Sequence, residues 1–303
     1  MNTNKSLGFI GTGAMGAPMA ERLIASGYQV SVYDPNPLAL KPLVALGARA
    51  ATSARDAATG VSTVFACLPS PQVSREVALG ESGIGKNLPD LKIYIEASTI
   101  GTSTVKEISQ SLRQQGISLL DAPVSGGPRG ARAGTLATMV AGERAIFERS
   151  LHIFETIAHK VFYVGAEPGL AQMTKLANNM ISAAGMAAAS EAIILAVKAG
   201  VDPTTLVDAI NSSTGRNTAT SDKFPQSVLT RSFNYGGKFS TMYKDVRLCL
   251  DEARALDVPM WVGSSVVQLW FQGMLEGRGD DDYTTITKML EEWTGVTVDG
   301  RSS

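Results

Sequence analysis

Short apolar runs alternate with longer helical stretches throughout the first half of this chain. The runs that we expect to form strands cover residues 7–10, 28–33, 63–68, 93–97, 119–124, 137–141 and 161–164. Regular alternation of this kind is typical of a parallel sheet with helices on both faces. The sequence therefore predicts a doubly wound α/β domain over residues 1–166.

The second half of the chain has a different pattern. Residues 170–199 contain no proline and many alanines, which predicts one helix of about 45 Å at the usual rise per residue. Lys175 and Glu191 interrupt this run, and the charge-free window between them is shorter than the roughly 20 residues of a membrane span. We therefore expect a soluble protein in which this helix connects two domains.

Helical patterns continue to the end of the chain. They are divided by Gly200 with Pro203, by a polar loop over residues 215–237 and by Pro259, and no strand pattern recurs. We predict an all-α C-terminal domain over residues 167–303. Its many small apolar residues favour packing against another subunit, so we expect a homodimer or homotetramer.

Composition and charge exclude several classes of protein. The net charge of -1, with 27 basic residues spread along the chain, is not that of a nucleic-acid-binding protein. Cys67 and Cys249 belong to no CxxC pair, so neither a disulfide framework nor a zinc site is indicated, and a reducing compartment fits. The N-terminal sequence does not resemble a signal peptide. We therefore expect a cytoplasmic protein without a bound metal.

Gly11, Gly13 and Gly16 form a GxGxxG motif directly after the first predicted strand, where a helix is expected to begin. In a dinucleotide-binding turn the first glycine permits the tight turn, the second lets the backbone approach the pyrophosphate, and the third lets helix and strand pack closely. The unpaired N–H groups of the helix start then face the phosphates. This context predicts a Rossmann-type domain with a dinucleotide site.

Asp34 follows the second predicted strand, about 20 residues after Gly13, where an acidic side chain accepts hydrogen bonds from the adenosine ribose. Asp34 and Pro35 would also form a simple turn without any ligand. A carboxylate at this position repels the 2′-phosphate of NADP, and no arginine follows closely to neutralise one. We therefore expect NAD rather than NADP, although Lys41 is near enough in sequence to reach a phosphate.

A second glycine-rich stretch follows the predicted strand at residues 119–124. Ser125, Gly126 and Gly127 can present successive N–H groups and one hydroxyl to an anion such as a carboxylate. A loop that serves only to reverse the chain would have the same composition. The spacing alone leaves both interpretations open.

Few side chains of this sequence are suited to act as a general acid or base beside a bound dinucleotide. His152 and His159 both fall on one predicted amphipathic helix, where we expect surface or packing residues. Lysine is then the natural general acid and base. Lys175 stands among alanines, with Asn178 and Asn179 three and four residues later on the same helix face. The spacing does not separate these two asparagines.

Four segments, taken in order, resemble the β-hydroxyacid dehydrogenases, which include 3-hydroxyisobutyrate dehydrogenase and tartronate semialdehyde reductase. They are GFIGTGAMGAPMAERL from residue 8, DAPVSGGPRGARAGTL from residue 121, the segment 169–179 ending in KLANN, and YKD from residue 243. The resemblance covers almost the whole chain. It implies an NAD-dependent oxidoreductase that interconverts a small 3-hydroxy acid and its semialdehyde.

The resemblance also assigns roles to individual residues. Lys175 matches the catalytic lysine and Asn179 an asparagine that helps to hold the substrate, while Ser125, Gly126 and Gly127 match the loop that binds the substrate carboxylate. The positions that match cofactor contacts are Gly11, Gly13, Met15, Gly16, Asp34, Leu68, Pro69, Thr99 and Lys244. The resemblance leaves open whether Asp245 is functional or structural.

The chain departs from the family pattern at two positions. Thr12 stands where leucine is common, and Glu96 stands where aspartate is frequent. The loop at residues 216–237 matches no particular member, so the end of the substrate that carries its side chain stays open. Imine reductases share this scaffold but generally lack the lysine. A dinucleotide-binding protein without turnover would have no need to retain Lys175, Asn179 and Ser125 together.

Overall fold

The computed structural model of the chain describes residues 5–85 and 88–301. The chain forms two compact units, Met1–Lys175 and Leu176–Ser303. The division falls inside the long helix α8, Leu170–Lys198. The first residues of this helix belong to the first unit because their hydrogen bonds are made there, with Asp121 at the end of a strand.

The first unit is built on a sheet of nine strands among the described residues, in the order β3-β2-β1-β4-β5-β6-β8-β7, with β9 paired to β8. The strands are β1 Ser6–Ile10, β2 Gln29–Tyr33, β3 Arg49–Ala50, β4 Thr63–Ala66, β5 Ile93–Glu96, β6 Ser118–Asp121, β7 Val124–Ser125, β8 Leu136–Ala141 and β9 Ala158–Gly165. The pairs from β1 to β6 are all parallel. This part of the sheet confirms the prediction.

The sheet differs from the prediction at one edge. β8 runs antiparallel to β6 and β7 and parallel to β9, so the sheet is mixed. The run predicted as a single strand over residues 119–124 is divided into β6 and β7. Pro123 lies at the division, and its ring nitrogen has no hydrogen to donate to a strand ladder.

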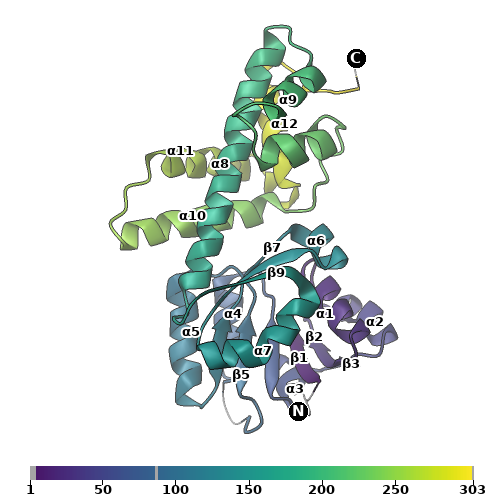
Figure 1. The fold of residues 1–303 in the computed structure, drawn as a ribbon, viewed down its shortest axis with the longest axis vertical. Coiled ribbons are helices and arrows are strands. Elements are labelled where there is room, and N and C mark those ends of the chain that lie inside the picture. The colour runs from purple at the N-terminus through teal and green to yellow at the C-terminus, as the bar shows by residue number, and fades with distance from the viewer. Residues whose placement is uncertain (1–4, 86–87, 302–303) are drawn as a thin grey trace. The chain divides into compact units, whose positions relative to one another are not determined.

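Seven helices of the described residues accompany the sheet before α8 (Figure 1). They are α1 Gly16–Ala25, α2 Pro37–Ala45, α3 Ala54–Ala58, α4 Pro71–Leu79, α5 Thr102–Gln114, α6 Gly127–Ala133 and α7 Arg144–Ile157. One apolar core joins Phe9 with Leu23 and Phe154, and a second joins Val64 with Ile108. Because side chains from adjacent strands enter both cores, the sheet is covered on both faces as a doubly wound fold requires.

The second unit contains helices and, among its described residues, no strand beyond an isolated bridge between Lys238 and Asp282. After α8 come α9 Pro203–Asn211, the π-helix η1 Ala219–Val228, α10 Phe239–Ala255, α11 Trp261–Leu275, the short 3₁₀ turns η2 Arg278–Asp280 and η3 Tyr283–Thr285, and α12 Ile286–Thr294. This all-helical unit confirms the predicted fold class.

The predicted polar loop over residues 215–237 was wrong in its centre, where η1 forms. Polar side chains there serve as local caps: Asn217 Oδ1 accepts a hydrogen bond from the Ala219 N–H at 2.8 Å. Phe224 and Val228 are buried on one side of η1. Pro225 lies inside this π-helix, and its presence made a helix difficult to predict from the sequence.

Helix α8 buries one side in the core of the second unit. Leu176, Ala183, Met186 and Ile193 are fully buried in one cluster with Trp270. Among the described residues, α8 is the one helix long and apolar enough to cross a membrane, with 44% of its most apolar window buried. A single helix of this length and hydropathy is weak evidence for a membrane span, because the core helices of soluble proteins have the same properties.

Candidate active site

The glycine-rich turn between β1 and α1 has a different steric requirement at each glycine. Gly11 has φ +90°, and a Cβ there would lie 2.2 Å from the Cys67 carbonyl oxygen. A Cβ at Gly16 would lie 1.9 Å from the Gly11 carbonyl oxygen. A Cβ at Gly13 would meet no atom within 4 Å. The turn thus needs Gly11 and Gly16 for its own packing and leaves open space at Gly13, where a pyrophosphate could approach.

Asp34 follows β2 and is hydrogen-bonded through both carboxylate oxygens. Its Oδ2 accepts a hydrogen bond from the Thr12 N–H at 2.8 Å, and its Oδ1 accepts one from the Asn36 N–H at 2.9 Å. The side chain therefore fixes the glycine-rich turn as well as its own turn. Each oxygen retains capacity for a further hydrogen bond, so the carboxylate is still able to accept one from a ribose hydroxyl.

The segments after β4 and β5 are tied together by Ser98. Its hydroxyl oxygen accepts a hydrogen bond from the Leu68 N–H at 2.6 Å, and its own N–H donates to Glu96 Oε1 at 3.0 Å. Leu68 with Pro69, and Thr99, are the predicted cofactor contacts of these two segments. Because the carboxyl ends of parallel strands lie along one edge of a sheet, both segments follow strands at the edge that carries the glycine-rich turn.

Glu96 is fully buried at the end of β5. Besides the Ser98 N–H it accepts a hydrogen bond from the Tyr94 hydroxyl at 3.1 Å. Burial raises the pKa of Glu96 to about 7, and these hydrogen bonds offset part of the effect. In the sequence Glu96 was notable only because it stands where aspartate is frequent in the family pattern. That difference did not predict a buried carboxyl group.

Asp121, at the end of β6, holds the beginning of α8. Its Oδ2 accepts hydrogen bonds from the N–H groups of Gly169 at 2.9 Å and Gln172 at 3.1 Å. These are donors that have no partner within the helix, and a carboxylate stabilises them. Asp121 is fully buried, and this burial raises its pKa to about 6.

The side chain of Gln172 extends this network to the segment after β5. Its Nε2 donates to Asp121 Oδ1 at 2.7 Å and to the Ser98 carbonyl oxygen at 3.0 Å. Its Oε1 accepts hydrogen bonds from the N–H groups of Ile100 at 2.8 Å and Gly101 at 3.1 Å. The start of α8 is thereby fixed to the residues on either side of Thr99. Gln172 was not among the residues predicted from the sequence.

The loop predicted to bind a carboxylate lies between β7 and α6. Gly126 and Gly127 have φ +130° and +63°, conformations that side chains other than glycine rarely adopt. Both are exposed and Ser125 is half-buried. A Cβ at Gly127 would meet no atom within 4 Å. The loop therefore has room for an anion beside its backbone.

Lys175 and Asn179 are both buried, one turn apart on α8. Asn179 Nδ2 donates to Asp245 Oδ2 at 2.6 Å, while its Oδ1 accepts a hydrogen bond from Asn178 Nδ2 at 3.0 Å. Asn178 is exposed. The structure thus separates the two asparagines that the spacing could not, since only Asn179 shares the burial of Lys175.

Asp245 on α10 joins two of the predicted site residues. Its Oδ1 accepts a hydrogen bond from Lys244 Nζ at 2.7 Å, and Lys244 forms an ion pair with it. Its Oδ2 holds the Asn179 amide. Lys244 belongs to the second unit, whereas the other predicted cofactor contacts belong to the first. Asp245, left open by the sequence, is therefore the residue that orients both neighbours.

The histidines do not take part in these networks. His152 lies on α7 and stacks on Tyr28, with ring centroids 6.1 Å apart. His159 is exposed in β9; its predicted place on the same helix was wrong because α7 ends at Ile157. Within residues 5–85 and 88–301, no group of three or more His, Cys, Asp or Glu side chains is placed to hold a metal ion.

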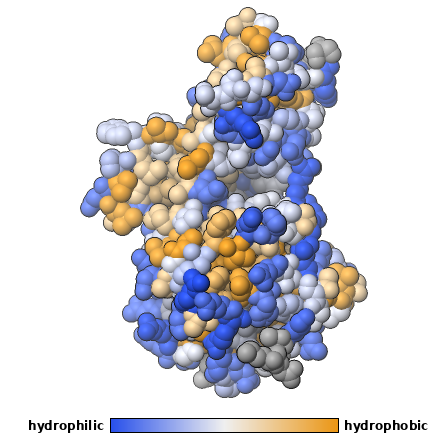
Figure 2. Space-filling model, viewed as in Figure 1, coloured by the Kyte–Doolittle hydropathy of each residue, from blue (hydrophilic) through white to orange (hydrophobic). Residues whose placement is uncertain are grey.

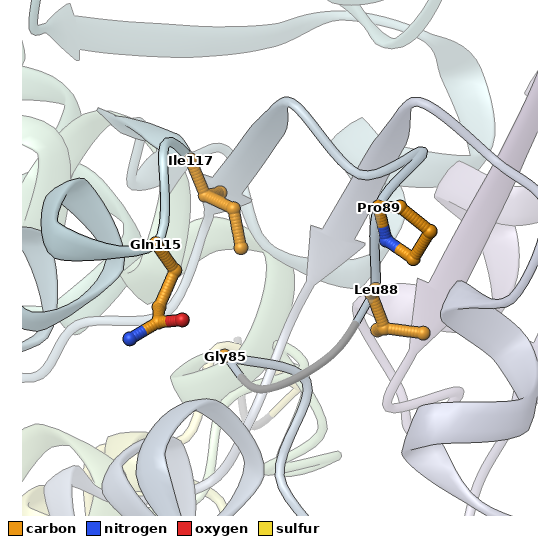
Figure 3. Close-up of a pocket in the computed structure, with 5 residues that line it drawn as sticks. All are labelled: Gly85, Leu88, Pro89, Gln115 and Ile117. Carbon is orange, nitrogen blue, oxygen red and sulfur yellow. The ribbon is translucent and has the colours of Figure 1, made fainter.

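The first unit also contains a pocket that is lined by other residues (Figure 3). It is lined by Gly85, Leu88, Pro89, Gln115 and Ile117. Pro89 and Ile117 precede β5 and β6, so this pocket lies by the amino ends of the strands. Ligands of open α/β sheets bind outside the carboxyl ends, and the pocket contains none of the predicted site residues.

Two family models together match nearly the whole chain. Residues 6–165 match the NAD-binding domain of 6-phosphogluconate dehydrogenase. Residues 169–290 match the NAD-binding domain of NADP-dependent 3-hydroxyisobutyrate dehydrogenase. Both matches follow the two units of the structure closely.

Characterised relatives and solved structures extend over the full length. The chain is 31% identical over 300 residues to 2-(hydroxymethyl)glutarate dehydrogenase of Eubacterium barkeri, covering 99% of each protein. It is 34% identical to 3-hydroxyisobutyrate dehydrogenase of Pseudomonas aeruginosa, covering 93% of this chain and 97% of the relative. The structure of Mycobacterium tuberculosis 3-hydroxyisobutyrate dehydrogenase with L-serine superposes with a TM-score of 0.84 at 30% identity, covering 94% and 98%. An imine reductase from Pseudomonas sp. shares 21% identity at a TM-score of 0.59, which shows the fold alone.

Proposed function

Because this chain belongs to the β-hydroxyacid dehydrogenase family, we propose that it catalyses the reversible, NAD-dependent oxidation of a small 3-hydroxy acid to its semialdehyde. Membership of the family makes it an NAD(P)-dependent oxidoreductase that acts on CH–OH groups. The observation that carries the proposal is the placement of Lys175. This lysine is buried on α8 with Asn179, and the helix start is fixed through Gln172 to the residues beside Thr99.

Lys175 is the proposed general acid and base. When bound, the nicotinamide accepts or donates the hydride. The alcohol carbon can release a hydride only as its hydroxyl proton leaves, so an amine at the oxygen must take that proton, and in the reverse direction the ammonium returns it. Asn179 is proposed to hold the substrate beside this amine. Asp245 fixes its amide in one orientation through the 2.6 Å hydrogen bond.

The glycine-rich turn and Asp34 support a dinucleotide, and Asp34 supports NAD in particular. The open space at Gly13 fits a backbone approach to a pyrophosphate. Both oxygens of Asp34 are already oriented by N–H donors. A fixed negative charge repels a 2′-phosphate, so the proposed cofactor is NAD with NADP disfavoured.

Ser125, Gly126 and Gly127 are proposed to bind the substrate carboxylate. The two glycines have positive φ and are exposed, and Ser125 adds a hydroxyl donor. An imine reductase activity is not favoured, because an imine substrate needs no such anion site and the likeness to imine reductases is one of fold alone.

A homodimer or homotetramer is proposed from the surface of the second unit. Ile181, Leu195, Trp261 and Val262 are large apolar side chains that are more than two-thirds exposed, at 74%, 71%, 86% and 72%. Figure 2 shows apolar surface gathered over the region of α10 and α11. Apolar surface of this extent is typical of association sites.

The test is NADH formation with a panel of 3-hydroxy acids, compared for the wild type and Lys175→Ala. We expect the variant to lose roughly 10²- to 10⁴-fold in turnover while it still binds NADH. Lys198→Ala is the matched control, since Lys198 is an exposed lysine of the same helix. Turnover that persists in Lys175→Ala, or that does not require the substrate carboxylate, would contradict the proposal.

A further inference from the structure

Lys223 is a buried lysine in η1 that the proposed reaction does not use. Its exposed fraction is 3%. Its Nζ donates to Ser182 Oγ at 2.8 Å and to Thr218 Oγ1 at 3.2 Å, and it lies 5.6 Å from the centre of the Tyr283 ring. The ammonium group therefore has two hydroxyl partners and one aromatic face around it.

No carboxylate within the described part of the chain forms an ion pair with Lys223. Other cations with little exposure in this unit do have such a partner: Arg231 pairs with Glu291, and Lys244 pairs with Asp245. Burying an ammonium without a counter-ion costs free energy. Burial lowers the pKa of Lys223 to about 8, and the charge of Asp222 offsets part of this effect. The group is still mostly protonated at pH 7.

The position of Lys223 is defined by Ser182 on α8. Lys175, Asn179 and Ser182 are spaced by four and then three residues, so they share one face of this helix. Ser182 lies about 4.5 Å further along the axis than Asn179. The Lys223 ammonium is thus placed one turn beyond the amide that is proposed to hold the substrate. Thr218 is exposed and Ser182 is half-buried, so both hydroxyl partners of the ammonium belong to residues that border solvent.

We propose that Lys223 binds a second carboxylate of the substrate, which lies at the far end of the substrate's own side chain. This inference rests on the proposed function, in which Asn179 holds the substrate on the same face of α8. It names the substrate class as 3-hydroxy acids that carry a further terminal carboxylate.

The surrounding groups favour a carboxylate over a phosphate. One ammonium and the two hydroxyls of Ser182 and Thr218 offer a single positive charge and O–H donors, which match a monoanion. A phosphate is typically bound by arginine forks or by several N–H groups together. If Lys223 served only to hold η1 against α8, its removal would change the turnover of every substrate equally. A role in carboxylate binding would instead affect only substrates that carry the second carboxylate.

The experiment compares three substrates that differ at the far end: 3-hydroxyisobutyrate, 2-(hydroxymethyl)glutarate, and the terminal amide of the latter. The wild type should prefer the diacid to its amide by tenfold or more in kcat/KM, because only the diacid offers Lys223 a charged hydrogen-bond acceptor. Lys223→Met should lower kcat/KM for the diacid by about 10- to 100-fold, mainly through KM. It should change kcat/KM for 3-hydroxyisobutyrate less than threefold.

Two further variants keep the test decisive. Lys223→Arg retains the charge and should retain part of the preference for the diacid. Lys198→Met removes an exposed lysine and should leave all three substrates unchanged. Equal losses on the mono- and dicarboxylate in Lys223→Met, or no loss on either, would overturn the proposal. Melting temperatures identify a variant that does not fold, in which case Lys223→Gln takes its place.

A failure of the proposed function is separable from a failure of this inference. If the wild type oxidises none of the three acids, glutarate and its monoamide are titrated calorimetrically into the NADH-loaded enzyme. Glutarate binding that exceeds amide binding and is lost in Lys223→Met supports the carboxylate site without any turnover. Equal binding of both, or binding that Lys223→Met retains, overturns it.

Discussion

Gln172 and Asp121 are joined by two hydrogen bonds, one from the side-chain amide at 2.7 Å and one from the backbone N–H at 3.1 Å. They connect the start of α8 to the end of β6. The same amide continues to Ser98, Ile100 and Gly101. Three residues after Gln172 comes Lys175. The helix that carries the proposed acid and base is therefore fixed by one buried side chain to the segment that carries Thr99.

Replacing Gln172 should cost both stability and turnover. Gln172→Ala leaves two carbonyl or carboxylate acceptors and two N–H donors without their partner in a fully buried place. We expect the free energy of unfolding to fall by about 3 kcal/mol, measured by denaturant titration, and kcat to fall more than KM rises. Gln110→Ala, at an exposed position of α5, should change neither. A stable Gln172→Ala enzyme with unchanged kcat would show that the network does not position Lys175.

Glu96 should make stability depend on pH between about 4.5 and 7. Its folded pKa of about 7 lies above the ordinary value of 4.5, so the folded protein holds this proton more tightly than the unfolded chain does. The resulting stabilisation is fully present below pH 4.5 and is lost as the pH rises to 7, and the pKa difference corresponds to about 3 kcal/mol. Asp121, whose folded pKa is also raised, acts in the same direction from about 4 to 6.

Glu96→Gln isolates this contribution, because the amide resembles the protonated acid. Unfolding free energies measured from pH 4 to pH 8 should agree for the two proteins at pH 4 and diverge as the wild type loses stability towards pH 7. Glu107→Gln removes an exposed carboxylate that pairs with Arg75 and should follow the wild-type curve. Parallel curves for wild type and Glu96→Gln would mean that the buried carboxyl titrates at its ordinary pKa.

Local patterns in the sequence were sufficient for the parts of the fold that depend on neighbouring residues. The turn after β1 was predicted from three glycines and the long helix from its composition, because both reflect sterics within a few residues. The helical period placed Asn178 and Asn179 on the same face as Lys175 for the same reason, but only the family resemblance selected Asn179. The division of β6 from β7 at Pro123 and the antiparallel edge depend on which strands pair, and no local period indicates this.

The hydrogen-bond partners that the sequence did not predict lie far apart in the chain. Asp121 and Gln172 are 51 positions apart, and Asn179 and Asp245 are 66 positions apart. Lys223 appeared to belong to a polar loop, and its burial became visible only when η1 placed it against Ser182 on α8. A buried polar group is recognised by what surrounds it, and sequence spacing does not give that information.

Alanine substitutions at two glycines of the dinucleotide turn should have different effects: one should lower stability and the other should weaken NADH binding. Gly16→Ala places a methyl group where the Gly11 carbonyl oxygen lies, and should destabilise the protein by about 3 kcal/mol or more. Gly13→Ala adds a methyl group in open space, so the unfolding free energy should change by less than about 1 kcal/mol. Its NADH dissociation constant should rise at least tenfold. Unchanged NADH affinity in a well-folded Gly13→Ala protein would exclude a close approach of the pyrophosphate to this residue.

Asp34→Ser should change the preference between the two dinucleotides. The substitution removes the charge that disfavours a 2′-phosphate. It also removes the carboxylate oxygen that accepts a hydrogen bond from the Thr12 N–H. We therefore expect weaker binding of NAD and a fall of tenfold or more in the ratio of kcat/KM for NAD to that for NADP. Asp90→Ser, at an exposed position of the same unit, is the control. An unchanged ratio would show that Asp34 serves only the turn.

Asp245→Asn should separate positioning from folding on α10. The amide can still accept one hydrogen bond, but it removes the ion pair with Lys244 and presents N–H donors to Asn179 Nδ2 or to Lys244 Nζ. We expect kcat to fall about 10- to 100-fold, as for the loss of one charged hydrogen bond, and NADH affinity to weaken through Lys244. Asp251→Asn removes an exposed carboxylate of the same helix that pairs with Arg254 and should leave both quantities unchanged. If Asp245→Asn lowers only the melting temperature, with kcat and NADH affinity at wild-type values, then Asp245 stabilises the helices without orienting Asn179.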